Sequence, residues 1–123
     1  MSHVLLIGLG GALGAMARHA VNHATITLLG SSLAGTLIAN ISGTFLLGLL
    51  VGLLSSHAAL SPEIKIFLTV GFLASYTTFS TLSVATIQLL EKGDVSLAAI
   101  NLGVSVLLGL VAAIAGMILG RAI

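Results

Sequence analysis

The chain has 123 residues, of which 58% are apolar and only 6% are charged, with a formal net charge of +1. A soluble domain carries about 25% charged residues, so this composition excludes a water-exposed globular surface and indicates a single integral membrane domain over residues 1–123. The lack of cysteine excludes disulfides and thiolate metal sites, and the sequence offers no basic patch for nucleic acid.

Four apolar segments predict an all-α protein with four transmembrane helices. Each is long enough to cross a bilayer, which takes roughly 20 helical residues, and none alternates polar and apolar residues as a barrel strand does. They cover residues 3–28, 33–55, 64–90 and 95–119. The connections "GSS" (30–32), "HAALSPE" (57–63) and "EKGD" (91–94) hold the only proline and all three acidic residues. Ser61 before Pro62 predicts a helix N-cap.

The first segment raises two questions. "AMA" at 15–17 resembles a signal-peptide cleavage site, but "MSH" lacks Lys and Arg, so we expect mature protein from residue 1. Arg18 lies well inside the segment, where it can either extend to the headgroups or serve a function. His19 and His23 are one turn apart, but two ligands make a poor metal site, which favours interfacial histidines.

In the second segment, Asn40 is the polar residue that needs a partner. An unpaired amide in hydrocarbon is costly, so we expect it to meet another polar group. A hydrogen bond between helices is the favoured interpretation, and a functional site is the alternative.

The third segment contains "TTFSTLS" at 77–83, with five hydroxyl residues in seven positions. Several of these must face something other than lipid, and the upstream Gly71 is a predicted place for the helix to break. Unwound backbone at membrane depth must be buried in protein or line a polar cavity. Its freed carbonyls would bind a cation, and its N–H groups and hydroxyls would bind an anion. The edge of Phe79 carries partial positive charge and is a further anion contact.

Small residues recur at helical spacing. Gly10 and Gly14, the set Gly35, Ala39 and Gly43, and the set Ala112, Gly116 and Gly120 predict close helix packing. In the fourth segment a second stripe could line a polar path or form a close contact; it consists of Asn101, Ser105, Gly109 and Ala113.

The basic residues are divided evenly between the two sides of the membrane. Four crossings place Lys65 and Arg121 on one side and Arg18 and Lys92 on the other. The positive-inside rule then has no bias to act on, which favours dual topology and an antiparallel dimer over a weak fixed orientation. The embedded polar groups are hydrogen-bond donors, with no carboxylate among them, and this chemistry suits a small anion.

Three motifs together resemble the Fluc (CrcB) fluoride channels along the whole chain. They are "GGALGAMAR" (10–18), "GTLIANISG" (35–43) and "GFLASYTTFSTLS" (71–83). The resemblance implies an antiparallel dual-topology dimer with a break in the third helix and two pores. It also implies passive fluoride efflux from the cytoplasm through the inner (plasma) membrane, and a structural Na⁺ at the dimer centre.

Site residues follow from the resemblance position by position. Asn40 matches the pore asparagine, Arg18 the vestibule arginine and Phe79 the first of two pore phenylalanines. The backbone carbonyls of Ala74 and Thr77 would hold Na⁺. The remaining positions expected along the pore are Ser80, Thr81, Leu82, Asn101 and Ser105.

Departures from the family pattern leave alternatives open. Leu82 stands where most members have the second phenylalanine, Ala74-Ser75 replaces the Gly-Gly that precedes the break in the third helix, and Ala85 replaces a glutamate. The chain could be a homodimer with a modified pore, one half of a heterodimer, or an engineered variant. A small multidrug exporter would need a membrane carboxylate that the first segment lacks. A structural membrane subunit remains an alternative, whereas no nucleophile–base–acid set suggests an enzyme.

Overall fold

The computed structural model describes residues 2–56 and 59–123, and the elements within them are helical. The first two spans are α1 (His3–Leu29) and α2 (Ser32–Ser56), and the last is α6 (Val95–Ala122). The third span is composite, with α3 (Pro62–Ile66), the π-helical η1 (Phe67–Leu73), α4 (Ala74–Tyr76) and α5 (Phe79–Glu91). Four helical stretches are thus long and apolar enough to cross a membrane, as the sequence predicts.

Capping explains where two helices begin. Ser31 Oγ accepts the N–H of Ala34 at 3.2 Å, so α2 begins at Ser32, inside the predicted "GSS" connection. The predicted cap at Ser61 is confirmed, because its Oγ accepts the N–H of Ile64 at 3.3 Å. Residues 57 and 58, which belong to the predicted 57–63 connection, lie outside the described residues. So does Met1, where we expect the mature protein to begin.

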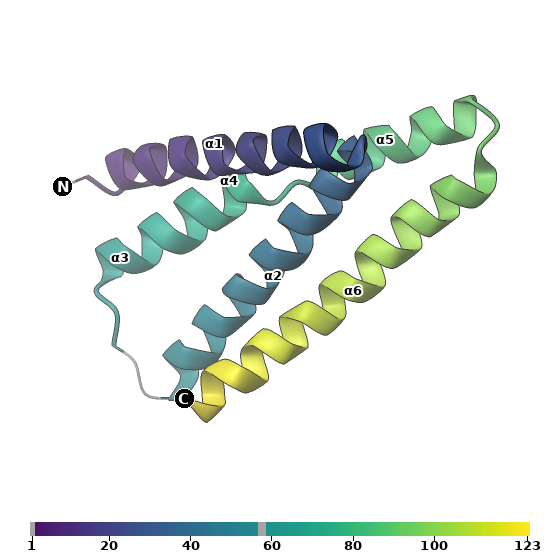
Figure 1. The fold of residues 1–123 in the computed structure, drawn as a ribbon. Coiled ribbons are helices and arrows are strands. Elements are labelled where there is room, and N and C mark those ends of the chain that lie inside the picture. The colour runs from purple at the N-terminus through teal and green to yellow at the C-terminus, as the bar shows by residue number, and fades with distance from the viewer. Residues whose placement is uncertain (1, 57–58) are drawn as a thin grey trace.

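The helices pack mainly in two pairs. Figure 1 shows α2 running beside α6, while α1 lies along the first half of the third span. The second half, α5, leaves α1 and packs against α6 instead. Both termini lie at the left in Figure 1, and the turn between α5 and α6 lies at the far right. The third span therefore connects the two pairs.

Glycines make both contacts close, as their spacing predicts. A Cβ on Gly10 would lie 2.5 Å from the carbonyl oxygen of Phe67, and one on Gly14 would collide with that of Phe72. In the other pair, a Cβ on Gly48 of α2 would lie 2.5 Å from the carbonyl oxygen of Ala113. Gly116 of α6 is equally close to the backbone of α2. Lipid supplies no hydrophobic force between helices, so such backbone proximity carries the packing.

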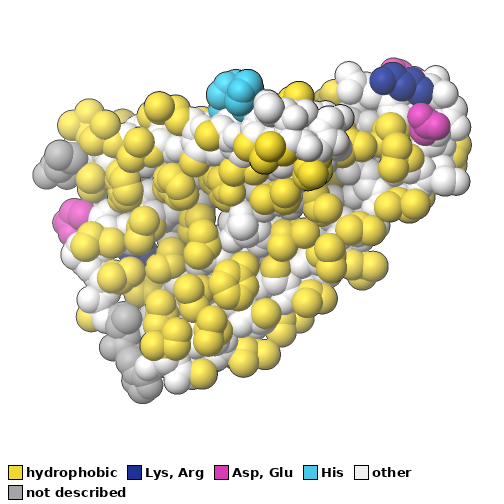
Figure 2. All heavy atoms as spheres, viewed as in Figure 1, with side chains coloured by type: hydrophobic (Ala, Val, Ile, Leu, Met, Phe, Trp, Pro, Cys, Tyr) yellow, Lys and Arg dark blue, Asp and Glu magenta, His cyan; other side chains and the backbone are white. Residues whose placement is uncertain are grey.

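The outer surface is apolar between charged ends. In Figure 2, hydrophobic side chains cover most of the visible face, and the visible Asp and Glu side chains lie at its two ends. Glu63, Glu91 and Asp94 are all exposed and lie at or beside helix ends. This distribution fits a protein surrounded by lipid.

Gly71 does not interrupt the third span, and the prediction of a break there is wrong. It is buried within η1, where a Cβ would lie 3.0 Å from Cα of Gly10, so its role is packing against α1. The residues with extended dihedral angles are Thr77 (φ −84°, ψ 158°) and Thr78 (φ −152°, ψ 121°), between α4 and α5.

Candidate functional site

The extended residues Thr77 and Thr78 are held by a side chain from another span. Asn40 of α2 accepts the N–H of Thr78 through Oδ1 at 2.7 Å and donates through Nδ2 to the carbonyl of Thr78 at 2.9 Å. Backbone freed at membrane depth must find such partners. The favoured interpretation of Asn40 as a hydrogen bond between helices is therefore confirmed.

Arg18 of α1 also bonds to a backbone carbonyl of the third span, in the turn that precedes the extended residues. Its Nε–H donates to the carbonyl of Ser75 at 3.1 Å, a position whose usual helical donor would be the N–H of Phe79. The side chain is half-buried, and its bond to Ser75 explains its depth in α1 better than free extension to the headgroups does.

The five hydroxyls of "TTFSTLS" divide into structural and available groups. Thr77 Oγ1 donates to the carbonyl of Leu73 at 3.0 Å, and Ser83 Oγ donates to that of Phe79 at 2.9 Å. Both are i−4 bonds within the span. Thr78 caps α5, because its Oγ1 accepts the N–H of Thr81 at 3.2 Å.

The remaining hydroxyls, those of Ser80 and Thr81, face a groove formed by α1, α2 and α5. Both also bond to Thr78, whose Oγ1 donates to Thr81 Oγ1 at 3.1 Å and lies 3.2 Å from Ser80 Oγ. The groove consists of three neighbouring cavities of about 230, 360 and 290 Å³. The first and second share Asn22, Thr36 and Thr81 in their walls. The second and third share four residues, which are Ser32, Leu33, Ala85 and Gln88.

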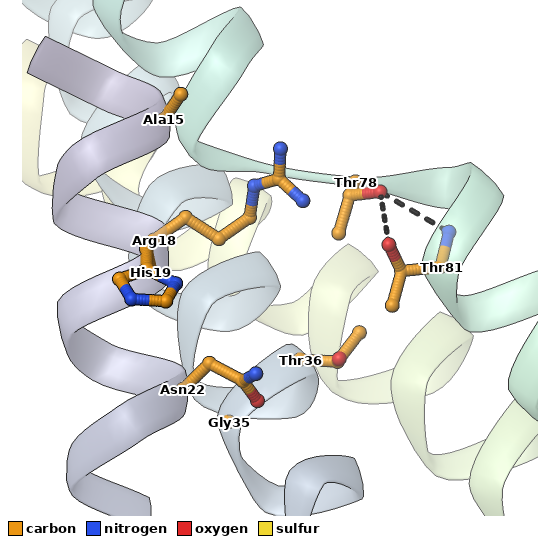
Figure 3. A pocket seen from close by; sticks show the side chains of 8 residues that line it. All are labelled: Ala15, Arg18, His19, Asn22, Gly35, Thr36, Thr78 and Thr81. Carbon is orange, nitrogen blue, oxygen red and sulfur yellow. Dashed lines mark hydrogen bonds between the residues drawn. The ribbon is translucent and has the colours of Figure 1, made fainter. Parts of the chain in front are cut away.

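Figure 3 shows the inner cavity, where Arg18 and Asn22 extend from α1 into the space bounded by Thr36, Thr78 and Thr81. Arg18 lies in this cavity and Lys92 in the third, at the other end of the groove. Among the described residues that line the three cavities, none is acidic. The polar groups of the groove are therefore cations, amides, hydroxyls and the His19 ring, which can donate to a small anion, and apolar side chains complete the walls.

The structure brings some of the predicted site residues together and separates others. Arg18, Ser80 and Thr81 line the groove, and Asn40 bonds to Thr78 at its wall. Phe79 is 76% exposed on the outside of the chain, whereas Leu82 is 5% exposed and lies inside it.

Asn101 and Ser105 lie on α6 and line none of the three cavities. Asn101 Nδ2 donates to Thr86 Oγ1 at 3.2 Å. Ser105 is 6% exposed, and its Oγ has no hydrogen-bond partner among the described residues. Of the stripe that they begin, Ala113 contacts Gly48 of α2, while a Cβ on Gly109 would have nothing within 4 Å.

The carbonyls of Ala74 and Thr77 lie at the interruption, and both lose their usual helical donor. The N–H of Thr78 donates to Asn40, and the N–H of Thr81 donates to Thr78 Oγ1. Freed carbonyls of an interrupted helix are the groups that coordinate Na⁺. The residues present are thus compatible with a monovalent cation.

Histidines form no metal site in the described part of the chain. The rings of His19 and His23 stack with centroids 6.4 Å apart. Within residues 2–56 and 59–123, no group of three His, Cys, Asp or Glu side chains could hold a metal ion.

Sequence reasoning missed three residues of the groove, namely Asn22, Thr36 and Gln88. Helical spacing was the available signal. Asn22 follows Arg18 by four residues and Thr36 precedes Asn40 by four, so each pair shares one face of its helix. Gln88 follows Thr81 by seven, or two turns.

Comparison with known proteins identifies the family of the chain. Residues 5–117 match the model of the family described as CrcB-like protein, Camphor Resistance (CrcB). A protein of Hydrogenovibrio crunogenus named "Fluoride-specific ion channel FluC" is 43% identical over 119 residues, covering 96% of this chain and 90% of its own.

Two further relatives carry the same name. The protein of Dehalococcoides mccartyi is 42% identical over 98% of this chain and 93% of its own. That of Rhizobium meliloti is 40% identical over 99% and 98% respectively. Both the family match and these full-length similarities place the chain by its sequence, and it belongs to the CrcB-like family.

Proposed function

We propose that this protein is a channel that passes fluoride passively out of the cytoplasm, and not an enzyme. The observation that carries the proposal is the groove, whose walls carry Arg18, Lys92, amides and hydroxyls beside apolar side chains, with no acidic residue among the described residues that line it. Anion pores use basic side chains to attract the ion and weak neutral donors to let it leave. Fluoride as the ion comes from the names of the relatives.

The proposed pore includes the residues that the family pattern indicates. Arg18 attracts the anion, and Ser80 and Thr81 donate hydrogen bonds along the groove. Asn40 keeps the hydroxyl-bearing turn in place through Thr78, and its second Nδ2 hydrogen can donate to the ion. The family pattern indicates four further pore positions, which line none of the three cavities of the single chain. They are Phe79, Leu82, Asn101 and Ser105, and they belong to the proposal on the resemblance alone.

A second copy in antiparallel orientation would complete each pore. Phe79 points out of the single chain, so the groove of a partner is where its ring edge could contact an ion. The even division of Lys and Arg between the two membrane sides supports insertion in both orientations. The proposed dimer has two pores and resides in the inner (plasma) membrane.

A structural Na⁺ at the centre of the dimer is part of the proposal. The carbonyls of Ala74 and Thr77 would hold it, and Ala74 is exposed on the surface of the single chain. The ion would neutralise carbonyl dipoles that two copies bring together at the interruption of the third span.

Two alternatives to a homodimeric fluoride channel differ from it in the residues that they need. A heterodimer, in which a paralogue supplies the second phenylalanine and the glutamate, is favoured by Leu82 and Ala85. A proton-coupled multidrug exporter is disfavoured, because the described carboxylates are exposed at helix ends, away from any mid-membrane position.

Purified protein in liposomes tests the proposal. With a fluoride electrode, we expect fluoride efflux well above that of empty liposomes and much faster than chloride efflux. Efflux equal to that of empty liposomes would rule out a homomeric fluoride channel. Co-expression with a paralogue then tests the heterodimer, since flux that appears only in the mixture requires the partner.

Replacement of Na⁺ by a large organic cation during purification tests the ion. We expect the dimer to lose thermal stability in proportion to the loss of bound Na⁺. A dimer whose melting temperature does not depend on Na⁺ would contradict this part of the proposal.

A further inference from the structure

Asn22 occupies the junction of the groove, although neither its position in the motifs nor its chemistry singles it out in the sequence. It lines both the first and the second cavity, together with Thr36 and Thr81. It lies one turn beyond Arg18 on α1, and Figure 3 shows both side chains extending into the same space. Any ion that moves between the two cavities passes this residue.

The side chain of Asn22 is also unsatisfied. Its amide Oδ1 is buried and has no hydrogen-bond partner among the described residues. A buried polar atom without a partner costs about 1–3 kcal/mol, and in native proteins such an atom is the exception that marks strain, a functional role, or an ordered water or ion. Oxygen and nitrogen of an amide can exchange places by rotation. The group can therefore offer the groove either a donor or an acceptor.

The surrounding backbone leaves room for this side chain. A Cβ at Gly35 of α2 would lie 2.6 Å from Asn22 Oδ1, so only glycine leaves the amide its present place. The neighbouring Thr25 hydroxyl donates to the main-chain carbonyl of Asn22 at 2.9 Å and not to its side chain. Oδ1 is therefore enclosed against α2, whereas Nδ2 makes no hydrogen bond within the described residues and is the part of the amide left for a ligand at the junction.

We propose that Asn22 binds the permeating anion, a small hard anion with part of its water shell, as it passes from the Arg18 cavity to the outer groove. The inference rests on the proposed channel function and adds a residue to that site. Nδ2–H donates to the anion, while Oδ1 stays enclosed against Gly35 of α2. A neutral amide binds weakly enough to release the ion, whereas Arg18 supplies the attraction over distance.

Three substitutions and a control test this role. Asn22→Leu removes both polar atoms at similar size, Asn22→Asp replaces the donor by a negative charge, and Asn22→Gln keeps the amide. Thr27→Leu is the control, because Thr27 is exposed on α1 and lies outside the walls of the groove cavities.

We expect fluoride efflux from liposomes to fall at least tenfold in Asn22→Leu, further in Asn22→Asp, and less in Asn22→Gln. Thr27→Leu should conduct as the wild type does. A tenfold change corresponds to about 1.4 kcal/mol in the barrier. If the wild type conducts and both Asn22→Leu and Asn22→Asp conduct as fast as the wild type, the inference is wrong while the channel function stands.

Thermal stability measured against increasing sodium fluoride, with sodium chloride as reference, gives a readout independent of flux. Fluoride should raise the melting temperature of the wild type and of Thr27→Leu more than that of Asn22→Leu, because a ligand stabilises the state that binds it. This comparison holds even if the wild type alone does not conduct. An equal rise in all three proteins would overturn the role of Asn22, and Asn22→Asp, which also removes the donor, replaces Asn22→Leu if the latter does not fold.

Discussion

The contact of α2 with α6 and the groove that α2 forms with α1 and α5 are built in opposite ways from one helix. Toward α6, Gly48 and Gly52 bring two backbones together, with no side chain between them at those points. Toward α5, Thr36 and Asn40 carry polar groups, and cavities separate the helices. In the first region the helices approach closely because glycine has no side chain. In the second region hydrogen bonds keep the helices apart.

The largest effect is expected where the close contact is filled. A Cβ on Gly116 would collide with the carbonyl oxygen of Phe45 and lie 2.8 Å from the N of Leu49, both of them backbone atoms that cannot move aside. Overpacking costs about 1–3 kcal/mol, occasionally more, and we expect Gly116→Leu to exceed that range. Gly103→Leu on the same helix is the matched control, because a Cβ there meets nothing within 4 Å.

The yield of monodisperse protein in detergent measures both variants. We expect Gly116→Leu to aggregate or not to accumulate, and Gly103→Leu to elute as the wild type does. Equal behaviour of the two would mean that the α2–α6 contact is not the main source of stability.

The second prediction concerns the hydrogen bonds that shape the groove. Asn40→Leu leaves the N–H and the carbonyl of Thr78 without partners, and each unsatisfied buried group costs about 1–3 kcal/mol. We expect a lower melting temperature and at least tenfold slower fluoride efflux. Asn40→Asp keeps an acceptor for the N–H, so it should unfold at a temperature between those of Asn40→Leu and the wild type. If Asn40→Leu matches the wild type in both measurements, the hydrogen bonds to Thr78 contribute neither to stability nor to fluoride conduction.

These two regions also differ in how far the sequence predicts them. The glycine contacts could be predicted, because i, i+4 spacing within one helix is a local property. Residue patterns alone could not place the interruption, since it depends on Asn40, which lies 38 residues from Thr78 in the chain, and only the family resemblance put it after Ala74-Ser75. Gly71 looked like the weaker point of the helix, but packing against Gly10 keeps it helical. The hydroxyl cluster indicated a polar site, yet only the fold shows which hydroxyls remain available.

A third, smaller effect is expected at Leu82. Its side chain is buried on the face of α5 that also carries Thr86, one turn away. A phenylalanine ring there is larger than the leucine it replaces, so Leu82→Phe should lower stability by about 1–3 kcal/mol. We expect fluoride efflux not to increase. Leu82→Met, of similar volume, should cost less than about 1.5 kcal/mol. Faster efflux in Leu82→Phe at unchanged melting temperature would mean that the phenylalanine ring reaches the pore and that the wild-type pore lacks an aromatic contact there.

The smallest effect on stability is expected between α5 and α6. Asn101 and Thr86 share one hydrogen bond of 3.2 Å, and side-chain bonds between membrane helices contribute about 0.6 kcal/mol on average. Asn101→Leu and Thr86→Val should therefore each shift the melting temperature only slightly, and the double variant should measure their coupling. Since Asn101 is a proposed pore residue and Thr86 is not, Asn101→Leu should slow fluoride efflux and Thr86→Val should not. Equal efflux in the two variants would assign Asn101 to packing, and the pore would then be bounded by the groove of α1, α2 and α5 with no contribution from α6.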